Sequence, residues 1–190
     1  MKKQEFFPAY FIDMNTAVEA VDHDVLLDCV RMIQSCKTAG GKIIIVGNGG
    51  SAAIASHVSV DFTKAANLRS INFNEADLIT CFSNDYGYEN WVAQALAAYA
   101  DPNDVVILIS SSGASMNMIN GAKQCRAMNI PLITLSGFMS DNPLRKAGDI
   151  NLWVDSSSFN VVEMTHHIWL LAIVDFIIDD QHKKFSGITS

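Results

Sequence analysis

Two short segments rich in glycine, serine and asparagine could hold a phosphate group. Gly47 to Ser51 offers backbone amides that can approach an anion closely, and Ser110 to Ser115 adds hydroxyls and a glycine. Each segment follows a β-branched apolar run and precedes a helical pattern. Because the start of a helix presents free N–H groups and partial positive charge, both segments are candidate phosphate sites. Without lysine, they suit a phosphate that is held rather than transferred.

Histidines and acids near these segments could move protons. His57 and Asp61 are four residues apart in a helical pattern and therefore share a face. This spacing suits a pair of metal ligands, a base with its orienting partner, or a simple surface contact. Glu163, His166 and His167 cluster in the first turns of the last helical pattern, with Glu163 and His166 on one face. Stabilisation of the helix start and packing at an interface are the alternative roles there.

The first glycine segment leaves other functions open. Gly47-x-Gly49-x-x-Ala52 fits a dinucleotide-binding fingerprint, but Asn74 stands where the acid that binds ribose is expected. A Walker loop would need a lysine that is missing, and a nucleophile elbow would need glycine in place of Ala53. Either segment taken alone is also consistent with an ordinary strand-to-helix turn. A nucleotide-binding enzyme therefore remains an alternative.

The elements that position these residues alternate between strand and helix patterns. Gly40 and Gly41 end an N-terminal helical stretch, and a loop is expected at 83–87. The alternation predicts an open, mainly parallel sheet between two helical layers, a three-layer, Rossmann-like α/β/α sandwich with extra N-terminal helices. Strands are expected at 42–46, 68–73, 105–109, 131–135 and 150–154, and helices at 52–66, from 75, and at 89–100, 116–128 and 162–179.

Composition narrows the class of protein. The 190 residues predict one globular unit, with residues 1–40 as a helical segment for oligomerisation and 41–190 as the binding domain. A net charge of −7 argues against nucleic-acid binding, and a mean hydropathy of +0.19 indicates apolar surface buried between subunits. The apolar run Ile168–Val174 is short of the ~20 residues of a membrane span. Four cysteines without CxxC spacing indicate free thiols in a reducing cytoplasm.

Taken together, four motifs carry a family resemblance. Gly47–Ala53, His57, Asn84–Gly87 and Ser110–Ser115 resemble a SIS (sugar isomerase) domain, and they are most similar to those of the phosphoheptose isomerases. These enzymes interconvert sedoheptulose 7-phosphate and a heptose 7-phosphate for bacterial surface glycans. The resemblance runs from Leu26 to Asp179 with the motifs in the same order.

The resemblance implies a phosphosugar isomerase of lipopolysaccharide biosynthesis, in the cytoplasm and as a homotetramer. It implies Zn²⁺ as the candidate cofactor, with His57 and Asp61 as metal ligands. No nucleotide is expected, and neither a nucleic acid nor a membrane is expected as a partner. The substrate-binding residues that it implies are Asn48, Gly49, Gly50, Ser51, Asn84, Asp85, Ser110, Ser111, Ser112 and Ser115.

The last helix departs from the isomerase pattern. The family presents Gln-Glu there with a His eight residues after the Gln, whereas this chain has Val162 and Leu170 at the Gln and His positions. Asp61 also replaces a Glu. We expect Asp61 to act as base and His166, one turn before Leu170, to act as its acid/base partner. His57 would orient Asp61 or join it on the metal. The alternative function is a non-catalytic SIS protein that senses a sugar phosphate or assists assembly.

Helix length favours one phosphate site over the other. Ser51 and Asp61 are ten residues apart, about 15 Å of helix, which is longer than a sugar phosphate spans comfortably. The phosphate is therefore expected on Ser110–Ser115, and the last helix is expected to come from a neighbouring subunit.

Overall fold

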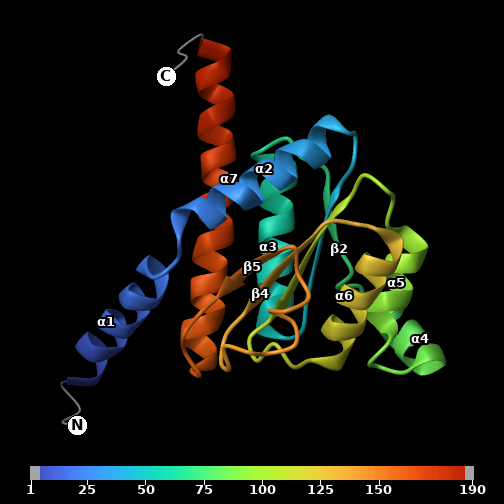
Figure 1. Ribbon diagram of the computed structural model, residues 1–190, viewed down its shortest axis with the longest axis horizontal. Coiled ribbons are helices and arrows are strands. Elements are labelled where there is room, and N and C mark those ends of the chain that lie inside the picture. Colours follow the sequence, from blue (N-terminus) through green and yellow to red (C-terminus); the bar gives the residue numbers. More distant parts are fainter. Residues whose placement is uncertain (1–4, 187–190) are drawn as a thin grey trace.

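The computed structural model describes residues 5–186 of the chain, and its centre is a sheet of five parallel strands. The strand order is β2-β1-β3-β4-β5, so the two strongest predicted strands, β1 and β3, lie side by side (Figure 1). Because all strands are parallel, their carboxyl ends meet at one edge, where ligands of such sheets bind. The strands are β1 (Ile43–Gly47), β2 (Ser70–Asn72), β3 (Val105–Ser110), β4 (Leu132–Ser136) and β5 (Ile150–Trp153).

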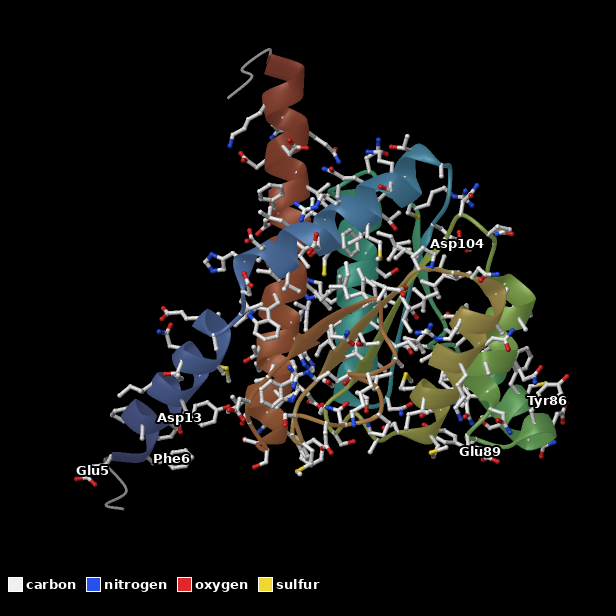
Figure 2. The ribbon with its side chains drawn as sticks, in the orientation of Figure 1. Glu5, Phe6, Asp13, Tyr86, Glu89 and Asp104 are labelled. Carbon is white, nitrogen blue, oxygen red and sulfur yellow. The ribbon has the colours of Figure 1, made fainter. Side chains whose placement is uncertain are left out.

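Helices connect the strands and cover both faces of the sheet. Two helices precede the first strand, and the first of them extends away from the body of the molecule with Phe6 at its start (Figures 1 and 2). The helices are α1 (Phe6–Glu19), α2 (His23–Thr38), α3 (Gly50–Lys64), α4 (Ala76–Tyr86), α5 (Trp91–Tyr99), α6 (Met116–Met128) and α7 (Phe159–Ser186).

Side-chain alternation in the central strands builds two cores. Ile43 and Ile45 of β1 pack on the face covered by α2, α3 and α7, whereas Ile44 and Val46 pack on the face covered by α5 and α6. All four side chains are fully buried, which is typical of strands buried on both faces of a parallel sheet. The predicted α/β/α architecture is thereby confirmed.

Two predicted segments differ most from the structure. The segment expected as a loop at 83–87 forms the last turn of α4, which continues to Tyr86 and ends at Gly87. Gly87 has a φ of 85°, a conformation that glycine adopts easily and that stops the helix. The last helix begins at Phe159 rather than at 162 and continues to Ser186.

The last helix also resembles a membrane span in length and composition. Phe159–Lys183 of α7 has a mean hydropathy of 1.6 in its most apolar stretch, but half of that stretch is buried inside the structure. The buried side of α7 packs on α1, α2, α3 and β4. Burial against the sheet layer therefore accounts for the apolar character of this helix.

A buried ion pair joins β1 and β3 at the edge opposite the carboxyl ends. Lys42 Nζ lies 2.6 Å from Asp104 Oδ2 and 2.6 Å from Asp101 Oδ2. Asp104, labelled in Figure 2, is 1% exposed and also accepts hydrogen bonds from the backbone N–H groups of Lys42 and Asp101. These bonds hold the starts of β1 and β3 together. They lie at the edge of the sheet opposite the carboxyl ends, where ligands of such sheets bind.

Candidate functional site

A small cavity opens at the carboxyl ends of β1 and β3. It measures about 120 Å³, and its polar lining comes from the two segments singled out in the sequence, together with one acid from α7. Ser115 is the N-cap residue of α6, so the free amides of that helix start face the same region. Within the described part of the chain, no lysine or arginine lines it. The lining residues are Asn48, Ser51, Ile109, Ser110, Ser111, Ser112, Ser115, Phe159 and Glu163.

Two serine hydroxyls of the β3–α6 segment bond to each other. Ser110 Oγ donates to Ser115 Oγ at 3.1 Å, across the turn made by Gly113. Gly113 has a φ of 64°, and a side chain there would overlap the amide of Asn142. The hydroxyls of Ser110 and Ser115 can turn toward a phosphate, since each can donate or accept. The segment therefore has the donors that a phosphate requires.

Glu163 occupies the start of α3. A Cβ atom placed on Gly50 would overlap the Glu163 carboxylate, so only glycine allows this approach. The carboxylate also accepts a hydrogen bond from Ser111 Oγ at 3.3 Å. A negative charge at a helix start is stabilised by the helix dipole. Glu163 thus links α7, the first glycine segment and the serine segment in one site.

Asn48 is held in a fixed orientation at the rim of the cavity. Its side-chain amide forms two reciprocal hydrogen bonds with Asn117 of α6, at 3.0 and 2.8 Å. Asn117 is 2% exposed, and the hydroxyl of Tyr88 donates a third bond to Asn48 Oδ1 at 3.1 Å. Nothing in the sequence pattern distinguished Asn117 or Tyr88, because their role depends on contacts between elements.

A cluster of two histidines and one acid lies between α3 and α7. His57 Nδ1 and His167 Nε2 are 2.8 Å apart, and His57 Nε2 lies 3.3 Å from Asp61 Oδ2. Burial, followed by the neighbouring His57, lowers the pKa of His167 from 6.5. This shift favours the neutral form of the His167 imidazole. Both helices belong to one chain, so the contact does not need the neighbouring subunit expected from the sequence.

His166 lies elsewhere, although the sequence favoured it as the partner of Asp61. Its ring is fully buried, with Nε2 3.1 Å from the Ser136 carbonyl, and it packs beside Trp169. Burial lowers its pKa to about 4. Successive side chains on a helix diverge by about 100°, so His166 faces the core and His167 faces α3. The structure therefore brings His167, rather than His166, to His57.

Asn84 and Asp85 lie in the last turn of α4, outside the residues that line the serine cavity. Both are exposed, and Asn84 donates a hydrogen bond to Asp85 at 2.8 Å. The α4–α5 connection that follows reaches the cavity through Tyr88 and its bond to Asn48. Sugar binding by Asn84 and Asp85 stays a prediction that these contacts do not test.

The zinc site implied by the family fits these residues poorly. Both ring nitrogens of His57 already face partners, and Val162 and Leu170, at the family's ligand positions, are fully buried and apolar. Across residues 5–186, no group of three or more His, Cys, Asp or Glu side chains is arranged to hold a metal ion. We therefore derive no chemical step through a metal.

Comparisons with known proteins agree with this fold. The family model described as "SIS domain" matches residues 7–137, so the chain is a SIS-domain protein. The phosphoheptose isomerase of Mycobacterium bovis is 30% identical over 173 residues, which cover 85% of this chain and 86% of that protein. That of Syntrophotalea carbinolica is 29% identical, with 88% and 90% covered.

The solved structures show the same likeness. The phosphoheptose isomerase from Neisseria gonorrhoeae superimposes with a TM-score of 0.84 at 26% identity, and the match covers 92% of this chain and 98% of that one. Within the SIS-domain class, the chain belongs to the phosphoheptose isomerase family.

Proposed function

We propose that this protein isomerises an aldose and ketose phosphate, with sedoheptulose 7-phosphate and heptose 7-phosphate as the pair. The observation that carries the proposal is the distance between its two polar clusters. Glu163 lines the serine cavity, and His167 lies four residues, about 6 Å, further along α7 in contact with His57. A sugar whose phosphate lies in the cavity, on the Ser110–Ser115 side, would extend along α7 toward His167 and its contact His57, which in turn bonds to Asp61. The names of the family relatives support the heptose substrate.

The serine segment would position the substrate. The hydroxyls of Ser110–Ser112 and Ser115, with the amides at the start of α6, hold the phosphate. Asn48, fixed by Asn117, would hydrogen-bond to the sugar. Because these contacts lie away from the reacting carbons, their binding energy serves to orient the sugar at the acid–base cluster.

The acid–base cluster would move the proton. Asp61 takes a proton from the carbon beside the carbonyl, and His167 gives a proton to the carbonyl oxygen, which yields an enediol. Return of a proton to the neighbouring carbon and loss of the other hydroxyl proton complete the isomerisation. His57, between Asp61 and His167, orients both groups. His167 takes the role that sequence spacing gave to His166.

Turnover of sedoheptulose 7-phosphate tests the proposal. We expect the purified protein, freed of metal with a chelator, to form the aldose, and Asp61→Asn to lower kcat by about 100-fold or more, as for loss of a general base. Asp155→Asn removes an exposed carboxylate after β5 and is the matched control. No turnover, with or without added Zn²⁺, would contradict the enzymatic function.

A binding protein without catalysis is the second candidate. Val162 and Leu170 favour it, because both are fully buried where the isomerase pattern has polar ligands. Tight binding of sedoheptulose 7-phosphate without product would support it. Loss of turnover in Asp61→Asn with unchanged binding would exclude it.

We also infer a cytoplasmic homotetramer of the lipopolysaccharide pathway, with residues 1–40 as its assembly segment. The support is an apolar surface on α1, which has no buried residue and exposes Phe7, Phe11 and Ile12 to about two thirds of their area. Light scattering should give four protomers for the parent and a smaller assembly for Phe7→Asp/Phe11→Asp. A parent that is a monomer would contradict the assembly.

A further inference from the structure

The glycine segment that opens α3 matches a dinucleotide-binding fingerprint, a feature that the proposed function does not use. In such segments a diphosphate group lies against the start of the helix, where the glycines allow close approach. Gly47, Gly49 and Ala52 occupy the fingerprint positions here, directly after β1. The fold thus presents two adjacent helix starts, those of α3 and α6, at one cavity.

One of these two helix starts is already occupied by the chain's own carboxylate. Glu163 lies against Gly50 so closely that a Cβ atom there would overlap it, and it accepts a hydrogen bond from Ser111. The α3 helix has no side-chain hydrogen bond from its N-cap residue, Gly49. The Glu163 carboxylate therefore provides the negative charge that a second phosphoryl group would otherwise bring.

The charges that line the cavity oppose a second phosphate. The cavity measures about 120 Å³ and opens to solvent, so charge rather than space is the selective feature. A second phosphoryl group bound beside Gly50 would meet the Glu163 carboxylate, with no lysine or arginine among the lining residues of the described chain to offset it. At about 4 Å, two like charges near a protein surface repel by several times the thermal energy.

We propose that Glu163 determines specificity for a single phosphate group, by excluding diphosphates and nucleotides from the glycine segment of α3. Its carboxylate can accept a hydroxyl of a singly phosphorylated sugar at this place, where a second phosphoryl group would present only negatively charged oxygens. The inference rests on the proposed function, because it places the one phosphate on the serine segment. It assigns Glu163 a role separate from proton transfer.

Calorimetric titration of the full-length protein with inorganic phosphate and with pyrophosphate tests the role of Glu163. We expect the parent to bind phosphate at least tenfold more tightly than pyrophosphate. In Glu163→Gln, which keeps shape and removes charge, we expect pyrophosphate affinity to rise at least tenfold and phosphate affinity to rise less. Glu163→Ala repeats the test should the first variant fold poorly, and circular dichroism checks both.

Asp155→Asn is the matched control, since it removes an exposed carboxylate that follows β5 at the same edge of the sheet. It should keep the parent's preference. The inference would be overturned if both Glu163 variants kept the parent's preference for phosphate over pyrophosphate, including the case in which pyrophosphate binding stays too weak to detect. An equal gain in affinity for the two anions would also overturn it. If the parent binds neither phosphate nor sedoheptulose 7-phosphate, the proposed function fails as well, so the two failures are distinguishable.

Discussion

Replacement of the buried His166 should reduce the acid sensitivity of the fold. The ring is fully buried, one nitrogen faces the Ser136 carbonyl, and Nδ1 has no hydrogen-bond partner in the described structure. Burial lowers the pKa from 6.5 to about 4. Between these two values the unfolded chain takes up a proton at His166 that the folded chain does not. The stabilising contribution is therefore complete above pH 6.5 and decreases as the pH falls toward 4.

The size of this effect follows from the two pKa values. Between pH 7.5 and pH 5.0, His166 should lower the free energy of unfolding by about 2 kcal/mol. His166→Gln cannot take up this proton, so the variant should lose about 2 kcal/mol less than the parent over the same interval, whatever its stability at pH 7.5.

Urea unfolding followed by tryptophan fluorescence measures this difference, at one fixed protein concentration because assembly contributes to apparent stability. His23→Gln, which replaces an exposed histidine at the start of α2, is the control and should retain the parent's pH dependence. Parent and His166→Gln curves that fall in parallel from pH 7.5 to 5.0 would refute the assignment of His166 to the core as a neutral ring.

Three further substitutions test the scaffold and the site. Asp104→Ala removes the acceptor for Lys42 and for two backbone N–H groups. It should lower the free energy of unfolding, measured by urea unfolding, by about 3 to 5 kcal/mol. A loss below 1 kcal/mol would contradict the role of this buried cluster. Gly113 has a φ of 64° and lies against Asn142, so Gly113→Ala should lower the free energy of unfolding by about 1 to 3 kcal/mol. It should also weaken phosphate binding, measured by calorimetry. Unchanged binding would argue against the serine turn as the phosphate site. Asn117→Ala frees Asn48 and should raise KM for sedoheptulose 7-phosphate by about tenfold, whereas an unchanged KM would show that the orientation of Asn48 does not matter.

The sequence predicted the sheet and its two polar segments because their signals are local. The β-branched runs of β1 and β3, each followed by glycine or serine, specify buried strands and the turns after them. The last turn of α4 was missed, since Ser83, Asn84 and Asp85 are typical loop residues and only the structure shows the helix continuing to Gly87.

The arrangement of side chains across α3 and α7 could not be predicted in the same way. Spacing along one helix brings His57 to Asp61, but the choice between His166 and His167 depends on how α7 is rotated against the sheet. The approach of Glu163 to Gly50 likewise depends on the distance between two helices. Such contacts between elements far apart in sequence are set by packing, which a single sequence does not reveal.

The position of the phosphate in a crystal structure with bound sedoheptulose 7-phosphate tests the central claim most directly. We expect its oxygens within hydrogen-bond distance of the hydroxyls of Ser110–Ser112 and Ser115 and of the amides that begin α6, with the carbonyl end directed toward His57 and Asp61. A phosphate found at another place, with Ser110 Oγ still bonded to Ser115 Oγ, would contradict the account.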